Sequence, residues 1–343
     1  MKKILLASTV LAMTGTVAAA EVTLSGAAGM GLQYNSETVE KSKVFSYATL
    51  VATMSGESDS GLSFGAVMNI KVENNGGLLN DDTTVFMSGA FGKLSMGAVG
   101  EADEVAGLSD IGWDGLDVDD VAESVVGDEL GDLTGASLAH NVNYTYSVNG
   151  LTFSMSGRLN EGFSPVNTTD SYAVGFKYST DMYYVGLGHA QHDAAYTIGS
   201  EFGALAGVAG TFDSKVTSLY AGADISGIKV AGLYAKGDHD VYNGAGVLLG
   251  TVKSDSFGLN ASYTMDAITV SAGYGMSDFK VAGTKVMQEE SYGLGASYDL
   301  GGGASIKGGI AKIKSLDESQ SGLGTLNSPV SETRADLGML FSF

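Results

Sequence analysis

The feature that most constrains this chain is a two-residue alternation of apolar and polar side chains, which recurs from one end to the other. In its first segment Val22, Leu24 and Leu32 fall on one parity, while Thr23 and Gln33 fall on the other. Period two with one apolar face is typical of a β-strand whose two faces meet different surroundings. The alternation therefore predicts an all-β protein.

The first alternating segment is long, because it runs over residues 21–35. Strands of globular sheets usually have about five or six residues, whereas a tilted strand that crosses a bilayer needs about nine to eleven. Beyond residue 20 there is no apolar run of the roughly 18 residues that a membrane-spanning helix requires. A membrane protein without such helices must close its backbone hydrogen bonds in a β-barrel. We therefore predict a transmembrane antiparallel β-barrel over residues 21–343.

The first 20 residues have the features of a secretory signal peptide. Lys2 and Lys3 are followed by the mostly apolar stretch Ile4–Val17, and Ala18–Ala20 precede Glu21. A basic start, a short apolar core and small residues at the end define such a peptide. We expect residues 1–20 to be removed during export to the bacterial outer membrane.

Breaks in the alternation divide residues 21–343 into sixteen predicted strands. Short turns alternate with longer polar stretches, which is typical of outer-membrane barrels. In the second half of the chain the longer stretches are predicted to be loops, namely Gln191–Ser214, Gly237–Lys253, Ser277–Gln288 and Lys314–Ser331. A barrel of about sixteen strands leaves an aqueous lumen. The alternative is a soluble sandwich or solenoid, but the Ser, Thr, Gly, Asn and Lys of the opposite face suit water.

Composition excludes several classes of function. Asp and Glu number 39 against 18 Lys and Arg, and a net charge of −21 would repel nucleic acid. Without cysteine and with only four histidines, the chain shows no zinc or haem motif. No histidine has a serine or acidic partner at a catalytic spacing, and no G-x-S-x-G occurs, so we do not expect an enzyme.

Five stretches resemble the porins of Rhodobacter-type alphaproteobacteria: EVTLSG, TMSGESDSGLSFGA, TVFMSGAFGKLSMG, YGLGASYDLGGGASIKGGIA and ADLGMLFSF. The match covers both ends and the first five strands, and is weak over residues 160–250. The resemblance implies a general diffusion porin, a homotrimeric outer-membrane barrel through which small hydrophilic solutes pass. It also implies a loop after the fifth strand that folds into the lumen. Phe343 is similar to the terminal aromatic residue that the outer-membrane assembly machinery recognises.

The longest predicted loop, Gly100–Ala139, is the most informative segment, because a connection of this length is normally functional or disordered. Its first part carries acidic residues and no Lys or Arg: Glu101, Asp103, Glu104, Asp110, Asp114, Asp117, Asp119, Asp120, Glu123, Asp128, Glu129 and Asp132. An acidic run is usually a solvated loop. Here, however, the run lies where the resembling porins have the loop that folds into the lumen, and apolar residues such as Val118, Val121 and Val125 are interleaved and can pack on a barrel wall. We therefore predict an inward-folded acidic constriction, and acidic rings favour cations.

Two arrangements would relieve the repulsion among these acids. The first is a basic wall facing the loop, for which the candidates on the lumen parity are Lys71, Lys93, Arg158, Lys177 and Lys229. The resembling family has an arginine-rich wall, whereas this chain has only Arg158 and Arg334 after residue 20. The sequence thus predicts a weakly compensated acidic pore that passes cations.

The second arrangement is a bound divalent cation. Asp117, Asp119 and Asp120 are spaced so that their carboxylates could share one calcium ion, although no EF-hand pattern is present. Two functional alternatives also stay open at this point, a substrate-specific channel and a structural or adhesive barrel. Neither an aromatic slide nor a dense basic lumen patch, as specific channels have, stands out in the sequence.

Overall fold

The architecture was analysed in a computed structural model. It describes residues 21–74, 76–77, 79–113, 116–130, 138–159, 171–197, 209–317 and 330–343. The predicted signal peptide, residues 1–20, lies outside this part of the chain.

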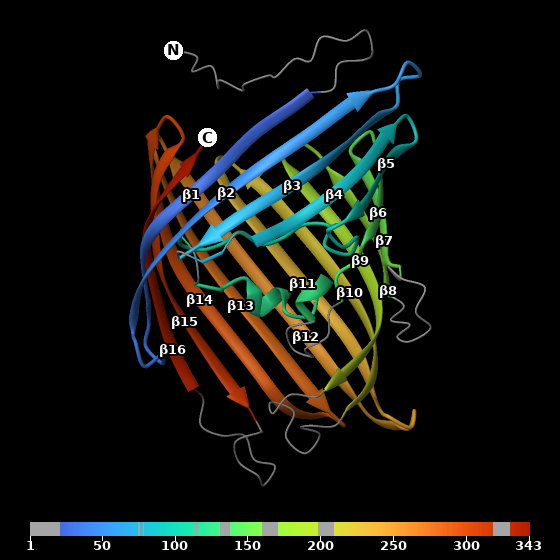
Figure 1. Cartoon of the computed structure of the whole chain (residues 1–343). Coiled ribbons are helices and arrows are strands. Elements are labelled where there is room, and N and C mark those ends of the chain that lie inside the picture. The colour runs from blue at the N-terminus through green and yellow to red at the C-terminus, as the bar shows by residue number, and fades with distance from the viewer. Residues whose placement is uncertain are drawn as a thin grey trace.

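Sixteen antiparallel strands form one closed barrel in which each strand pairs with its neighbours in sequence and β1 pairs with β16 (Figure 1). The predicted fold class and strand number are confirmed. The strands are β1 (Glu21–Asn35), β2 (Ser42–Glu57), β3 (Ser63–Glu73), β4 (Leu79–Gly89), β5 (Gly92–Gly97), β6 (Val142–Val148), β7 (Leu151–Arg158), β8 (Ser171–Ser179), β9 (Tyr183–Thr197), β10 (Ala209–Ile225), β11 (Ile228–Asn243), β12 (Leu248–Met265), β13 (Ile268–Val281), β14 (Thr284–Gly301), β15 (Ala304–Asp317) and β16 (Val330–Ser342).

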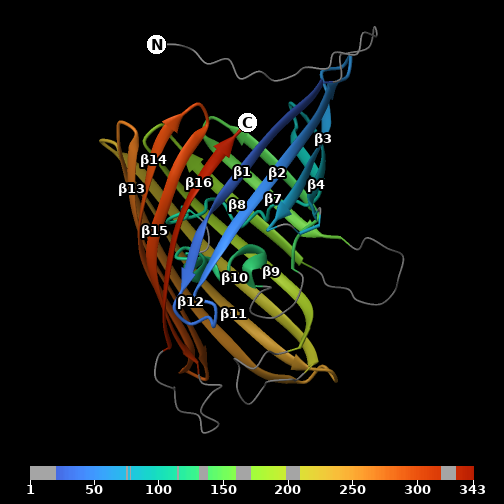
Figure 2. The same cartoon turned by 60° about the vertical axis from the view of Figure 1, so that its left-hand side comes forward.

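Both ends of the barrel sequence meet at the same rim. The backbone N–H of Phe343 donates to the carbonyl of Gly26 at 2.9 Å, which joins the C-terminus to β1. The turns at this rim are short; residues 226–227, for example, connect β10 to β11. Figure 2 shows β1 and β2 running obliquely across the near side of the barrel, as strand tilt in a closed barrel requires.

The alternation sorts side chains between lipid and lumen. Outward-facing Leu24, Leu219, Leu259 and Leu294 are about half exposed or more, as expected for a face that contacts lipid. Their neighbours on the other parity are small or polar and face the interior. In the described part of the chain, no helix is long and apolar enough to cross a membrane.

The predicted loops of the second half were wrong in extent. β11 and β12 continue through Gly237–Lys253 to a turn at residues 244–247, and β13 and β14 continue to a turn at residues 282–283. In these extensions the outward face carries ion pairs between strands, such as Lys253 with Asp238 at 3.0 Å and Lys280 with Asp255 at 2.9 Å. The inward face there carries buried apolar residues such as Val241, Val252 and Phe279. The apolar residues have therefore moved from the outward to the inward face, and the outward apolar pattern ends although the hydrogen-bonded ladder continues.

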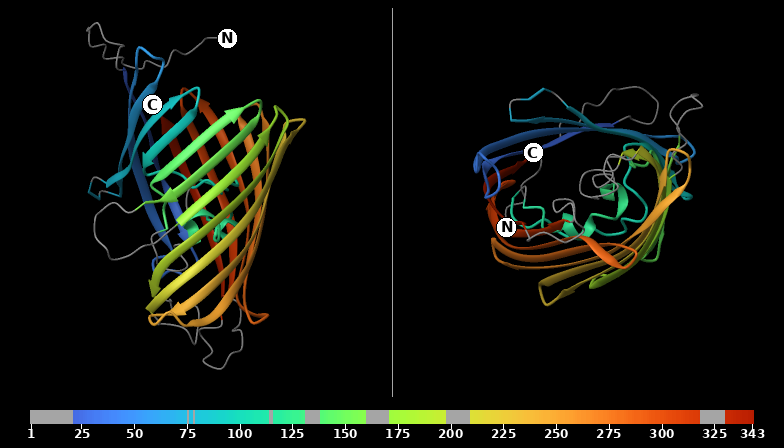
Figure 3. Two further views of the ribbon diagram at one scale, coloured as in Figure 1. Left: turned by 90° about the vertical axis from the view of Figure 1, so that its right-hand side faces the viewer. Right: turned by 90° about the horizontal axis from the view of Figure 1, so that it is seen from below.

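The hydrophobic core lies inside the barrel rather than between sheets. The described parts of the connection between β5 and β6, residues 98–113, 116–130 and 138–141, enter the lumen and contain the helix α1 (Asp120–Glu123) and the 3₁₀ turn η1 (Gly127–Glu129). Val125 and Val126 of this connection pack in one buried cluster with Phe212 and Val216 of β10. Figure 3 shows these described parts of the connection inside the barrel, next to the inner wall. The predicted inward fold of this loop is therefore confirmed.

Candidate functional site: the loop inside the barrel

The loop of residues 98–141 is called the pore loop below, and side chains of the barrel wall hold its described parts by hydrogen bonds to backbone carbonyl groups. Ser277 of β13 donates its hydroxyl to the carbonyl of Val121 at 2.5 Å, and Ser291 of β14 donates to Val118 at 2.5 Å. Asn260 of β12 donates to the carbonyl of Ser109 at 3.0 Å. These side chains satisfy carbonyl groups that burial would otherwise leave without partners.

The wall behind the pore loop is lined with glycine because the loop backbone approaches it too closely for side chains. A Cβ atom on Gly175 or Gly188 would overlap the carbonyl oxygens of Ala102 and Asp103. The same substitution at Gly258 would overlap Leu108 and Ala122 of the loop. Further glycines of this kind are Gly273, Gly275, Gly293, Gly295 and Gly309. Much of the glycine content on the lumen parity of β8–β15 thus forms a seat for the loop.

The far end of this seat holds the single tryptophan. The Trp113 ring lies against Gly31 of β1 and Gly338 of β16, where a Cβ atom would overlap it. Its backbone N–H donates to Asp336 at 2.8 Å. Four residues later, Asp117 pairs with Arg334 of β16. The pore loop is therefore anchored where the first and last strands close the barrel.

The structure divides the predicted acidic residues of the loop into two groups. Glu104, Asp110 and Asp120 are exposed to the lumen space, and Asp117, Glu123 and Glu129 are half-buried. Glu101, Asp103 and Asp119 are buried against the wall or within the loop. Asp114, Asp132 and the side chain of Asp128 lie outside the described residues.

Two of these carboxyl groups have raised pKa values. Burial raises the pKa of Asp119 to about 8, and repulsion from Asp110 and Asp120 adds to this effect. Burial also raises the pKa of Glu123 to about 7, although the hydrogen bond from the Leu108 N–H opposes it. At neutral pH these groups therefore carry less negative charge than the sequence alone indicates.

The five predicted basic wall residues occupy different surroundings. Lys71 forms an ion pair with Glu73 at 2.5 Å, and the amino group of Lys93 lies 4.7 Å from the centre of the Phe86 ring. Lys177 and Lys229 line a cavity of about 500 Å³ that is also bordered by Ser109 and Ile111 of the pore loop. Arg158 lies near the end of the pore loop. Burial lowers the pKa of His140, the positive charge of Arg158 lowers it further, and the resulting pKa is about 4. The structure thus spreads these cations instead of gathering them in one patch.

Comparison with known proteins agrees with this arrangement. Residues 7–318 match the Gram-negative porin family. The chain belongs to this family. It is 34% identical to the porin of Rhodobacter capsulatus over 341 residues, which cover 94% of this chain and 100% of that porin.

Solved structures share the fold of this porin. A porin structure refined at 1.8 Å resolution is similar at a TM-score of 0.68 with 29% identity, covering 94% of this chain and 100% of that one. OmpT of Vibrio cholerae, in a trimer form, has a TM-score of 0.73 at 12% identity, covering 94% of this chain and 99% of that one. Family and fold together indicate an outer-membrane channel rather than an enzyme.

The calcium ligands predicted for the porin are not the set that the fold brings together. Among the described residues, carboxylates of Asp119, Asp120 and Glu123 come within 4.8 Å of one another, while Asp117 pairs with Arg334. Calcium binding itself stays a prediction.

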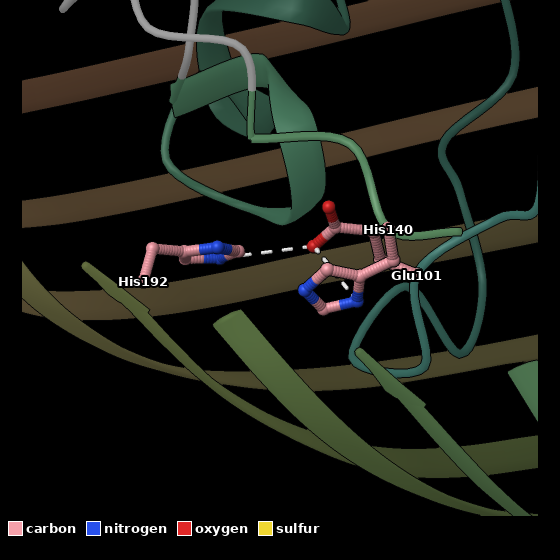
Figure 4. A group of neighbouring side chains, drawn as sticks. All are labelled: Glu101, His140 and His192. Atoms are coloured by element: carbon pink, nitrogen blue, oxygen red, sulfur yellow. Dashed lines mark ion pairs between the residues drawn. The ribbon is translucent and has the colours of Figure 1, made fainter. Parts of the chain in front are cut away.

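Sequence reasoning missed one cluster of buried ionisable side chains in this porin. Glu101 and His140, near the two ends of the pore loop, meet His192 of β9 in a buried group (Figure 4). The sequence pattern gives little indication of this contact, because the alternation predicts a loop from residue 191 onward, which includes His192. In the structure β9 continues to Thr197, and residue 192 falls on the lumen parity.

Proposed function

We propose that this porin is a general diffusion channel through which small hydrophilic solutes pass passively, with a preference for cations. The observation that carries the proposal is the set of exposed acids Glu104, Asp110 and Asp120 on a loop inside the barrel. A barrel of sixteen strands is wide enough for an aqueous lumen, and the loop narrows it. Carboxylates at such a constriction attract cations and repel anions.

The basic residues support the same preference. Lys71 already pairs with Glu73, and Lys177 and Lys229 border a cavity that also contains Asp181 and Asp224. Because the basic side chains are dispersed, they compensate the exposed acids of the loop only in part. With a net charge of −21, the whole chain adds a field of the same sign.

Planar-bilayer recording tests the proposal. In a KCl gradient the wild-type channel should give a reversal potential of the sign expected for cations, and currents should stay proportional to voltage. The double variant D110N/D120N should move this potential toward zero. D266N, which removes an acid from the short turn between β12 and β13, is the control and should leave it unchanged. An anion-selective wild type, or a double variant that matches wild type, would contradict the cation preference.

We further propose that the porin is a homotrimer whose barrels meet along β1 and β2. Ala28 and Ala48 are paired across these strands and face outward, as do Gly26 and Ala52. Small residues allow barrels to approach closely. OmpT of Vibrio cholerae, which shares the fold, has been obtained in a trimer form. Native mass spectrometry of the detergent-solubilised protein should give three chains per particle, and A28W/A48W should reduce this to single chains.

Recognition of the C-terminus by the outer-membrane assembly machinery is also a proposal. Phe343 follows β16 and is 70% exposed, so its ring is accessible at the rim. F343A should lower the amount of folded barrel in the outer membrane without changing the conductance of the channels that form.

A further inference from the structure

A buried group of two imidazoles and one carboxylate lies where the pore loop joins the barrel. Glu101 follows β5 closely, His140 precedes β6, and His192 projects from β9 into the lumen. All three side chains are buried, with at most 2% of each side chain exposed in the pairs that they form. Figure 4 shows the carboxylate of Glu101 between the two rings.

The distances in this group are close to those of a metal site. Glu101 Oε2 lies 3.7 Å from His192 Nε2 and 3.9 Å from His140 Nδ1. One donor atom from each residue lies within 4.8 Å of the other two. Bonds of about 2.0–2.1 Å to a tetrahedral zinc ion place its ligands roughly 3.3 Å apart. The two distances from Glu101 therefore exceed the ligand spacing of a zinc site by about half an ångström.

The opposite ring nitrogens are held in the way that metal-binding histidines require. Ser171 Oγ lies 2.7 Å from His140 Nε2 and 2.5 Å from His192 Nδ1. In the tautomer in which the Ser171 hydroxyl accepts from both N–H groups, His140 Nδ1 and His192 Nε2 are the ring atoms that carry lone pairs. In this tautomer the Ser156 hydroxyl donates to His140 Nδ1 at 2.7 Å and accepts from the Ala102 N–H at 2.8 Å, so it orients the ring and the chain beside Glu101. An ion bound at His140 Nδ1 would take the place of the Ser156 hydrogen bond.

We propose that Glu101, His140 and His192 bind a divalent transition-metal ion, with Zn²⁺ as the best fit, which fastens both ends of the pore loop to β9. Two imidazoles and one carboxylate suit zinc and its neighbours in the first transition row, whereas Ca²⁺ and Mg²⁺ prefer oxygen ligands. Since the ligands come from both ends of the loop and from the wall, the ion would close the loop into a fixed ring. A water molecule can occupy the fourth position.

The first test measures zinc affinity of the folded full-length barrel in detergent. After treatment with a chelator, Zn²⁺ is titrated in competition with a chromogenic chelator, in excess Mg²⁺ to occupy surface carboxylates. Wild type should bind one zinc ion per chain. H192N should lower the zinc affinity by at least about tenfold. Substitution of a residue that only supports a metal ligand already causes a loss of about this size.

The matched control is H239N. His239 is also buried between two serine hydroxyls, Ser214 and Ser254, each at 2.8 Å, but it is not part of the cluster. Its replacement should leave zinc affinity unchanged. An equal loss in H192N and H239N, or wild-type binding no tighter than that of H192N, would overturn the proposal.

A second measurement keeps the proposal testable if H192N does not fold. Wild type loaded with Co²⁺ should show the intense visible absorption of a four-coordinate site, and E101Q should shift or abolish it. Zn²⁺ should also protect residues near Glu101 and His140 from hydrogen exchange in wild type only. Wild type without a Co²⁺ absorption band would show that the serine hydroxyls alone organise these three side chains, which would overturn the proposal.

Discussion

At the scale of single residues, burial changes the charge that the sequence assigns to the pore loop. Asp119 and Glu123 have raised pKa values of about 8 and about 7 because their carboxylates are desolvated near other acids. When the loop is docked, these two carboxyl groups hold their protons to higher pH than when it is undocked. Docking of the loop therefore weakens as the pH rises from the ordinary pKa values of 3.8 and 4.5 through the raised values.

The first prediction concerns the pH dependence of selectivity. Raising the pH through about 7 and then about 8 ionises Glu123 and Asp119, so the preference for cations should increase across this interval. D119N should remove the later part of the increase and make the docked loop more stable at high pH. Reversal potentials at a series of pH values measure the effect, with D266N as the control. A wild-type potential that does not change over this interval would contradict it.

The second prediction concerns the seat of Trp113. G338A places a methyl group where the indole now lies, and we expect loop docking to weaken by about 1–3 kcal/mol, the usual cost of overpacking. Trp113 is the only tryptophan, so its emission should shift to the red and its quenching by acrylamide should increase. G250A is the matched control, because a Cβ atom there meets nothing within 4 Å. Equal spectra for the two variants would show that the ring does not depend on this contact.

At the scale of elements, the strands of β9–β15 extend beyond the part that the apolar alternation marks. The extensions are held by the same ladder of backbone hydrogen bonds, but their outward residues are charged and pair across strands. An apolar outward face is needed only where lipid is the neighbour, so the alternation defines the lipid-facing part of a strand and not its ends.

The third prediction follows from these extensions. A short peptide tag inserted after Ala245 lies in the turn between β11 and β12 and should leave the barrel folded. The same tag after His239 interrupts the pairing of His239 with Val252 and moves the following side chains to the wrong face. This variant should fail to fold. Both positions lie in the loop expected from the sequence. A difference in gel migration between heated and unheated samples shows which variant is folded. Equal folding of the two variants would contradict the extended strands.

At the scale of the whole molecule, acidic residues outnumber basic ones, and the loop inside the barrel is also acidic. The exposed acids of the loop act over distances that salt shortens, because the Debye length is about 10 Å at 0.1 M and about 3 Å at 1 M.

The fourth prediction is that cation preference decreases as salt concentration increases. Reversal potentials should be measured at a fixed concentration ratio across the bilayer and at increasing mean concentration. A preference set by the charges of Glu104, Asp110 and Asp120 should be largest in dilute salt and should approach the ratio of ion mobilities in concentrated salt. A preference independent of salt would indicate direct ion binding at a narrow site instead.

The sequence alone determined the barrel and its strand number, and its resemblance to the porins implied the inward position of an acidic loop. Period two is a local property, and the absence of helical spans left a closed barrel as the one way to satisfy the backbone in a bilayer. The tertiary structure decided which acids are exposed, since Asp119 and Asp120 are adjacent in sequence but only the first is buried. It also decided that Glu101, His140 and His192 meet, because that contact depends on the register of β9 and on how both ends of the loop return to the wall. Burial and convergence depend on contacts between residues far apart in the chain, which no local pattern specifies.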